Sequence, residues 1–327
     1  MSDRFRWGIL GTGSIAKKFA EGLKAVPDAD LVAVGSRSQS TADTFAGAYD
    51  VPRRHASYEA LASDPEVDAI YVATPHSAHR DNSILCLEAG KAVICEKPFT
   101  INRQQADEVV AVARSRKVFL MEAMWSRYQP IMYKVREWLA EGAIGEVNML
   151  SADFGFRSGY QEGKRLWTPE LGGGALMDVG VYPVSFSSMV YGGPPTRITA
   201  LSDMHDIGVD EVTGIVLGHE NGGLAVVYTS IRSSTPQGAD ILGTEGSIRI
   251  QSPFWHATTA TLKAGKREET VELPVEGNGY NCEAEEVMRC VRAGKLESDI
   301  MPLDETLSVM TTLDSIRKEI GLKYPME

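Results

Sequence analysis

Short apolar runs alternate with amphipathic segments over the first 120 residues of the chain. Four segments have the apolar spacing of a helix, over residues 15–26, 41–49, 77–89 and 104–115. The apolar runs predict buried strands over residues 7–10, 31–35, 69–73, 92–95 and 118–121. This alternation predicts an α/β fold for the N-terminal part, with a doubly wound parallel sheet of the Rossmann type.

The pattern changes after about residue 122. Alternating apolar and polar positions predict strands over residues 147–156, 197–201, 214–218, 225–228 and 247–251. Helices are expected over 131–140 and from about residues 175, 282 and 306. We therefore expect a Rossmann domain at 1–122 and an α+β domain at 123–327 with a large, mostly antiparallel open sheet. The seam between two such domains is where a ligand is expected.

Composition disfavours nucleic-acid-binding, membrane and secreted proteins. Lys and Arg number 33 against 44 Asp and Glu, for a net charge of −11 in 327 residues, which disfavours nucleic acid and anionic membranes as partners. No apolar run approaches the roughly 20 residues of a membrane span, and the N-terminus has no signal-peptide core. The four cysteines show no CxxC spacing, so we expect free thiols and a cytoplasmic protein.

A glycine-rich turn follows the first predicted strand. It has the GxGxxA pattern of dinucleotide-binding folds, formed by Gly11, Thr12, Gly13, Ser14, Ile15 and Ala16. The first glycine permits a tight turn, the second lets the backbone approach a pyrophosphate, and the alanine keeps helix and strand close. The helix N-terminus adds N–H groups and positive potential for the phosphates.

The end of the second predicted strand bears on which dinucleotide binds. An NAD enzyme usually places Asp or Glu there for the ribose 2′-hydroxyl, but this chain has Ser36, Arg37 and Ser38. Arg37 is suited to pair with a 2′-phosphate by charge-assisted hydrogen bonds. NADP is therefore the expected cofactor, and use of NAD stays open.

Two further motifs complete a family resemblance. Glu96-Lys97-Pro98 follows a strand, and the run GGGALMDVGVYP covers residues 172–183. Together with the glycine turn, these motifs resemble the glucose–fructose oxidoreductase/inositol dehydrogenase (Gfo/Idh/MocA) family over nearly the whole chain. The segment MEAMWSRY at 121–128 and Tyr182 resemble its dimeric dihydrodiol dehydrogenases and NADP-linked D-xylose dehydrogenases. Many relatives, the inositol dehydrogenases among them, have His in place of Tyr182.

The resemblance implies roles for three residues. Lys97 would lie beside the nicotinamide and hydrogen-bond the reacting oxygen, and Glu96 would also border the cofactor. Tyr182 would be the general acid/base, and Asp178 would support the site electrostatically and by positioning. A free phenol titrates near 10, so its ionised form lies roughly 4 kcal/mol uphill at neutral pH. An ammonium group nearby stabilises phenolate, which makes a Lys–Tyr pair a workable proton-transfer unit. The sequence leaves open whether Lys97 or Tyr182 is the base.

Helical geometry bears on Asp178 and Tyr182. They are four residues apart, so a continuous helix would place both on one face. Pro183 is comfortable in a first helical turn and disruptive deeper in, so a kink is expected if the helix begins well before it.

The remaining candidates are a loop and a set of aromatic or basic residues. The loop containing Thr74, Pro75, His76 and His79 resembles the family's cofactor-facing loop. A zinc site at the two histidines lacks companion ligands in the sequence, so no metal is expected. Candidate substrate-binding residues near the domain junction and beyond are Trp125, Arg127, Tyr128, Trp167 and Trp255.

These features predict an NADP-dependent dehydrogenase that exchanges a hydride with a sugar, polyol or diol. Two alternatives remain: a non-catalytic NADP-binding sensor or repressor of the same fold, and a sugar–sugar oxidoreductase with tightly bound cofactor. A strand-rich second domain commonly pairs with a copy of itself, so a homodimer through the C-terminal sheet is expected.

Overall fold

The computed structural model describes residues 4–327 and divides the chain into two compact units. The first unit comprises the chain up to Trp125 together with Glu276–Thr306, and the second comprises Ser126–Val275 and Leu307–Glu327. The break at Trp125 lies close to the expected boundary at residue 122. The sequence pattern, however, assigned all of 123–327 to the second domain, whereas residues 276–306 belong to the first unit.

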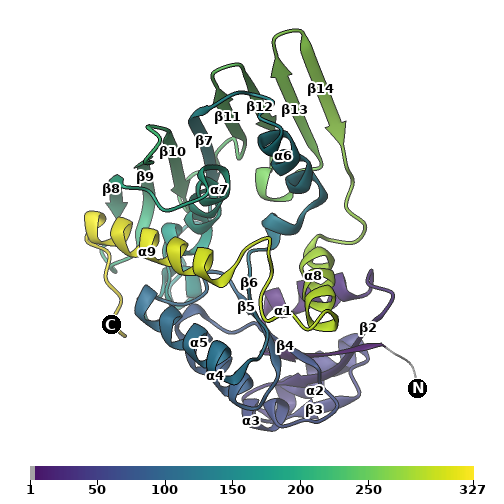
Figure 1. Ribbon diagram of the computed structural model, residues 1–327. Helices are drawn as coiled ribbons and strands as arrows, with labels where there is room; N and C mark the ends of the chain where they lie inside the picture. The colour runs from purple at the N-terminus through teal and green to yellow at the C-terminus, as the bar shows by residue number, and fades with distance from the viewer. Residues whose placement is uncertain (1–3) are drawn as a thin grey trace. The chain divides into compact units, whose positions relative to one another are not determined.

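The first unit is built on a parallel sheet of six strands (Figure 1). Their order is β3-β2-β1-β4-β5-β6, which is the doubly wound arrangement expected from the sequence. The strands are β1 (Phe5–Leu10), β2 (Ala29–Gly35), β3 (Arg53–His55), β4 (Ala69–Val72), β5 (Ala92–Glu96) and β6 (Leu120–Ala123). Every residue of β4, β5 and β6 is buried, which is why these strands appear as continuous apolar runs.

Five helices lie between these strands in the chain: α1 (Ser14–Leu23), α2 (Gln39–Tyr49), α3 (Tyr58–Ala62), α4 (His79–Glu88) and α5 (Arg103–Arg116). A sixth, α8 (Tyr280–Arg292), comes from the later segment of the unit. Helix α4 packs against α5, and α8 packs against α1. At that contact Gly22 leaves little room for a side chain, because an added Cβ would lie 3.0 Å from Tyr280 Cβ and 3.1 Å from the Asn281 backbone nitrogen. The sequence pattern did not predict β3 and α3, which are three and five residues long.

The second unit is built on an eight-stranded sheet of order β14-β13-β12-β11-β7-β10-β9-β8. Only β7 and β10 pair in parallel; the other neighbours are antiparallel, as the sequence predicts. The strands are β7 (Val147–Gly155), β8 (Arg197–Met204), β9 (Asp210–Gly218), β10 (Leu224–Ser230), β11 (Ala239–Gly243), β12 (Gly246–Ile250), β13 (Thr259–Ala264) and β14 (Arg267–Glu272). Three of them, β11, β13 and β14, were not anticipated.

Helices α6 (Pro130–Ala140), α7 (Val181–Tyr191) and α9 (Leu303–Ile320) complete the molecule. Contacts of α7 with β7 and β10, and of α6 with β13, cover one face of the eight-stranded sheet. Buried and exposed residues alternate along β9 and β10, so the opposite face of these strands carries exposed side chains.

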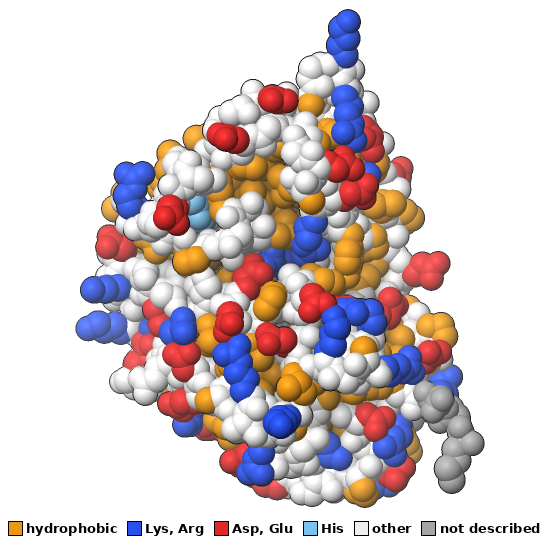
Figure 2. All heavy atoms as spheres, viewed as in Figure 1, with side chains coloured by type: hydrophobic (Ala, Val, Ile, Leu, Met, Phe, Trp, Pro, Cys, Tyr) orange, Lys and Arg blue, Asp and Glu red, His pale blue; other side chains and the backbone are white. Residues whose placement is uncertain are grey.

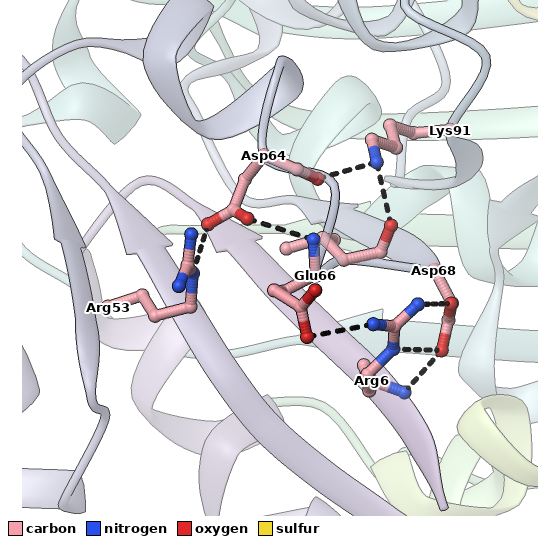
Figure 3. Close-up of polar contacts among 7 residues, drawn as sticks. Arg6, Arg53, Asp64, Glu66, Asp68 and Lys91 are labelled. Atoms are coloured by element: carbon pink, nitrogen blue, oxygen red, sulfur yellow. Dashed lines mark hydrogen bonds and ion pairs between the residues drawn. The ribbon is translucent and has the colours of Figure 1, made fainter. Parts of the chain in front are cut away.

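Charged side chains are concentrated where several strands of the first unit begin (Figure 3). The Arg6 guanidinium donates to both carboxylate oxygens of Asp68, at 3.1 and 2.7 Å, and Lys91 Nζ donates to the carbonyl oxygens of Asp64 and Val67. Asp64 is fully buried and accepts a 2.5 Å hydrogen bond from Arg53 Nε. Burial opposes ionisation of this carboxyl, yet its hydrogen bonds hold the pKa at about 2. We call Arg6, Arg53, Asp64, Asp68 and Lys91 the ionic cluster.

Candidate active site

The glycine turn of the first unit has the geometry that a dinucleotide requires. Gly11 has φ +105°, and a Cβ there would lie 2.8 Å from the carbonyl oxygen of Ala73, so only glycine fits. A Cβ on Gly13 would meet nothing within 4 Å, which leaves space for a ligand to approach the backbone. Helix α1 begins at Ser14 with no side-chain cap and no acidic residue in its first turn. Its N-terminus is suited to phosphate.

Polar groups without a carboxylate line the end of β2. Ser36 Oγ lies 2.6 Å from Thr41 Oγ1, and Ser38 caps α2 by accepting a hydrogen bond from the Thr41 backbone N–H. Arg37 is exposed and close enough to Tyr58 for its charge to oppose the rise that burial causes in the pKa of that phenol. A guanidinium, two hydroxyls and a helix N-terminus, groups suited to a 2′-phosphate, are therefore found here.

His79 connects the loop after β4 with the turn that follows β5 by hydrogen bonds. His79 is fully buried, and its two ring nitrogens lie 2.9 Å from the carbonyl oxygens of Pro98 and Thr74. Asn82 Nδ2 donates to Thr74 Oγ1. The rings of His76 and His79 are 5.6 Å apart. Within residues 4–327, no group of three or more His, Cys, Asp or Glu side chains is arranged to hold a metal ion.

Lys97 follows directly from the last residue of β5. That residue, Glu96, is buried, and its Oε2 accepts a 3.2 Å hydrogen bond from the Lys97 backbone N–H. The other oxygen, Oε1, accepts from the Tyr71 hydroxyl on β4. Glu96 therefore fixes the backbone from which Lys97 extends, at the carboxyl end of the sheet, where open α/β sheets bind ligands.

Asp178 and Tyr182 belong to a helical run that is not α-helical throughout. Residues Leu176–Gly180 form a π-helical turn, and α7 starts at Val181. Pro183 therefore falls in the first turn of α7, where its missing N–H costs little. The helix expected from about residue 175 thus begins with a π turn and becomes α-helical at Val181. Single π turns inside helices occur frequently at functional sites.

Two residues from outside the motif hold this run in place. Asp210 Oδ2 accepts hydrogen bonds from the Leu176 backbone N–H at 2.8 Å and from Thr213 Oγ1 at 2.7 Å. Burial raises the pKa of Asp210 to about 6, although these hydrogen bonds favour its ionised form. Arg165 Nη2 lies 2.5 Å from Asp178 Oδ1, so the Asp178 charge is paired.

Aromatic rings surround Tyr182. Phe154 stacks on Trp255 with ring centroids 3.4 Å apart and planes 5° apart. The Tyr182 ring lies 5.3 Å from Phe154 and 6.3 Å from Trp255. Figure 2 shows a hollow lined with hydrophobic side chains on the second unit, between α6 and α7. We call Phe154, Tyr182 and Trp255 the aromatic wall.

The other substrate-binding candidates have the following surroundings. Trp125 belongs to the first unit and stacks on Tyr280 of α8 with centroids 4.6 Å apart. Arg127 and Tyr128 are almost completely buried. Trp167 packs with Ala175, Val209 and Ile231 and lines a separate cavity of about 540 Å³, together with Arg157, Tyr160 and Arg232. Trp255, the fifth candidate, belongs to the aromatic wall.

Sequence reasoning missed Phe154, Arg165 and Asp210. Arg165 begins a short 3-10 turn after a polar loop, and Asp210 begins a strand 32 residues after Asp178 (210 − 178), so no local pattern connects either with the site. Phe154 was identified only as part of a strand. Its alternation along β7 gives its face of the sheet but not its aromatic partner.

Comparison with known proteins settles the family. Residues 5–124 match the model of the Gfo/Idh/MocA oxidoreductase family with its NAD-binding Rossmann fold, and residues 132–249 match the model of the family's C-terminal domain. The chain belongs to the Gfo/Idh/MocA oxidoreductase family. The resemblance predicted from the motifs is therefore confirmed, as are the fold class and the enzyme class, an oxidoreductase that uses a nicotinamide dinucleotide.

Relatives of known activity cover the whole chain. The trans-1,2-dihydrobenzene-1,2-diol dehydrogenases of Xenopus laevis and Mus musculus are 38% and 39% identical over 98% of this Gfo/Idh/MocA chain and 98–99% of their own. Among solved structures, a 3-ketoreductase from Actinomadura kijaniata in complex with NADP and TDP-benzene has a TM-score of 0.86 and 25% identity, covering 97% of this chain and 98% of its own.

Proposed function

We propose that this protein is an NADP-dependent dehydrogenase that moves a hydride between the nicotinamide and a hydroxyl-bearing carbon of a cyclic diol or sugar. The observation that carries the proposal is Tyr182, which stands in an aromatic wall and follows the ion-paired Asp178 by one helical turn. The full-length relatives, which are trans-1,2-dihydrobenzene-1,2-diol dehydrogenases, support a diol as substrate. The 3-ketoreductase, a structural neighbour, supports a sugar.

The residues of the first unit suit NADP. Gly11 to Ala16 would hold the pyrophosphate, and Ser36, Arg37 and Ser38 would hold the 2′-phosphate. The Thr74–His79 loop and Glu96 would border the nicotinamide half. NADP rather than NAD is supported by the absence of a carboxylate within Gly35–Ser38 and by the NADP in the 3-ketoreductase structure.

The chain's own task in the reaction is to manage one proton. When bound, the nicotinamide supplies or accepts the hydride. In the oxidative direction the substrate hydroxyl gives its proton to the Tyr182 oxygen as the C–H bond breaks, and in reduction the same proton returns. A nearby ammonium lowers the free-energy cost of forming the phenolate, and Lys97 is proposed for this role. Asp178 keeps this region polar, and its pairing with Arg165 prevents an unbalanced negative charge beside the phenolate.

The aromatic wall supports a ring as the substrate's body. Flat aromatic faces favour apolar ring surfaces and C–H edges, whereas an open-chain polyol would leave them exposed to water. A cyclic diol or a pyranose presents such a face together with the hydroxyl that reacts.

The experiment that tests the proposal is a pair of variants, Tyr182→Phe and Lys97→Met. Each is expected to reduce kcat at least about a hundredfold, the usual contribution of a positioned proton-transfer group, with little change in NADP affinity. Turnover is followed by NADPH absorbance with a trans-dihydrodiol and with D-xylose, and affinity by NADPH fluorescence. Tyr49→Phe and Lys263→Met serve as controls, since Tyr49 ends α2 in the first unit and the side chain of Lys263 on β13 is exposed. Near-normal turnover in both site variants contradicts these roles.

The exposed face of the eight-stranded sheet supports a homodimer. Exposed apolar side chains project from five adjacent strands: Met149, Leu201, Val216, Val226, Tyr228 and Leu242. Their register makes the patch continuous, because Leu242 pairs with Met149, and Val226 with Val216. A contiguous apolar patch on a flat sheet is typical of a surface that pairs with a second copy.

Sedimentation of Val226→Lys tests this assembly. A lysine at the centre of the patch would be buried against the partner without a counter-charge, so the variant is expected to sediment as one copy at a concentration of about 1 μM, where the parent sediments as two. Leu296→Lys, at an exposed leucine of the first unit, should stay dimeric. A parent that sediments as a single copy argues against the dimer.

Cytoplasmic location is proposed from the cysteines. Cys86, Cys95 and Cys290 are buried, Cys282 is half-buried, and all four are free thiols, as expected in a reducing compartment. No helix of the described residues is long and apolar enough to cross a membrane.

A further inference from the structure

Helix α8 places a carboxylic acid inside the first unit. Glu283, in the first turn of α8, is fully buried, and neither of its carboxyl oxygens has a hydrogen-bond partner among the described residues. A buried carboxylate without partners costs several kcal/mol, so a carboxyl in this position takes up a proton instead. No sequence motif includes Glu283, and the mechanism above does not use it.

Other acidic groups are grouped around this carboxyl. Glu96 from β5 and Tyr71 from β4 are joined by a hydrogen bond, and Glu96 and Glu283 both lie close enough to Tyr71 for an ionised carboxylate at either position to raise the pKa of its phenol. Further titratable neighbours among the described residues are Tyr280 and Cys282 on α8 and, near Glu96, Cys95 on β5 and the buried Glu122 on β6. Helix α1 contributes only an apolar ring, since Phe19 stacks on Tyr71 with centroids 3.8 Å apart.

The two carboxyl groups differ in their hydrogen bonds. Glu96 accepts from the Tyr71 hydroxyl and from the Lys97 backbone N–H, and both bonds favour its ionised form. Glu283 receives no such bond. Burial, and then the charge of Glu96, raise the pKa of Glu283 well above its ordinary value.

We propose that Glu96 and Glu283 hold one proton between them, carried on Glu283, and that Glu283 is thereby a positioning residue for Lys97. With the proton present, the pair carries a single negative charge, and Glu96 can keep its hydrogen bond to the Lys97 backbone. Loss of that proton would leave two buried carboxylates that repel each other. Glu96 would then be displaced, and Lys97 with it. The link to turnover rests on the proposed function; the shared proton does not.

Infrared difference spectroscopy of the cofactor-free protein tests the proton directly. At pH 8 the parent is expected to show the carbonyl stretch of a protonated carboxylic acid, and Glu283→Gln is expected to lose it. Asp210→Asn is the matched control: Asp210 is also fully buried and has a raised pKa, but its value of about 6 leaves it ionised at pH 8, so this variant should keep the band. A parent without the band at pH 8 overturns the proposal, even if no variant folds.

Activity against pH tests the positioning role. Gln mimics a protonated Glu and cannot lose a proton. Glu283→Gln should therefore keep kcat within about threefold of the parent at pH 7 and retain activity to higher pH than the parent. An alkaline limb identical to that of the parent overturns the positioning of Lys97.

Thermal unfolding separates this result from failure of the proposed function. A carboxyl whose pKa is raised by folding contributes stability below its unfolded pKa and loses it as pH rises toward the folded value. The Tm of Glu283→Gln minus that of the parent should therefore become more positive as pH rises from 5 to 9. Neither this measurement nor the infrared band requires a substrate, so both remain informative if Lys97 proves not to be catalytic. A Tm difference independent of pH contradicts the shared proton.

Discussion

Buried carboxyl groups at the two ends of the parallel sheet in the first unit have pKa values shifted in opposite directions. Where the strands begin, Asp64 is fully buried and bonded to Arg53, and its pKa is about 2. Near the carboxyl end, Glu283 is equally buried, faces another acid, and has a strongly raised pKa. Burial alone therefore does not decide the charge of a carboxyl; its hydrogen-bond donors do. One end of the sheet is arranged for stability, while the other keeps protonation and charge available for chemistry.

The largest expected effect on stability comes from removing Asp64, at the end of the sheet where the strands begin. Asp64→Ala removes the acceptor for Arg53 and His55 and the side-chain cap on the Glu66 backbone N–H, so we expect a loss of about 3 kcal/mol in the free energy of unfolding. Urea denaturation followed by circular dichroism measures it. Asp43→Ala, which removes an exposed pair with Arg54, should cost less than about 0.5 kcal/mol. Similar losses in both variants would show that the buried carboxylate contributes nothing special.

A second prediction uses pH. Folding lowers the pKa of Asp64 from its ordinary value near 3.8 to about 2, which corresponds to about 2.5 kcal/mol of stability. This contribution is present above pH 4 and is lost as pH falls from about 4 to about 2, because the unfolded chain takes up the proton first. Unfolding free energies measured over that window should fall less steeply in Asp64→Ala than in the parent. Parallel curves would refute the assignment.

The smallest expected effect concerns arginines at the two ends. Arg53 is committed to Asp64, whereas Arg37 is exposed, with no ion pair to a described residue. Arg37→Ala is expected to raise the Kd for NADP about tenfold and the Kd for NAD less than about threefold, since only NADP carries the 2′-phosphate. The Tm without cofactor should stay unchanged. Arg116→Ala, an exposed arginine on α5, is the control. Equal losses for both dinucleotides would count against the phosphate contact.

Much of the first unit could be predicted because its signals are local. Each strand from β1 to β6, apart from β3, is an apolar run between amphipathic segments, and the glycine turn specifies both a conformation and a ligand. Strand β3 was not predicted, because its three residues, Arg53, Arg54 and His55, have the polar sequence of a loop. A three-residue strand at the edge of a sheet needs no apolar alternation.

The remainder depended on contacts between distant segments. The sequence gives α8 an apolar face but does not say that this face packs on α1, more than 250 residues earlier (280 − 23 = 257). Asp210 was missed for the same reason: its hydrogen bond to the Leu176 backbone N–H depends on β9 packing against the Leu176–Gly180 turn. Residues in motifs were found, whereas residues that hold the motifs in place were not.

The return of residues 276–306 to the first unit has a consequence for the order of folding. As the chain emerges from the ribosome, residues 1–125 are complete long before α8 exists, so the apolar side of α1 must wait while about 150 further residues (276 − 125 = 151) are synthesised. The nucleotide-binding unit thus reaches its final form only after nearly all of the second unit has been made. A gene fragment cut at the apparent domain boundary should yield an aggregation-prone product, whereas a permuted gene that joins α8 to the first 125 residues should yield a folded one.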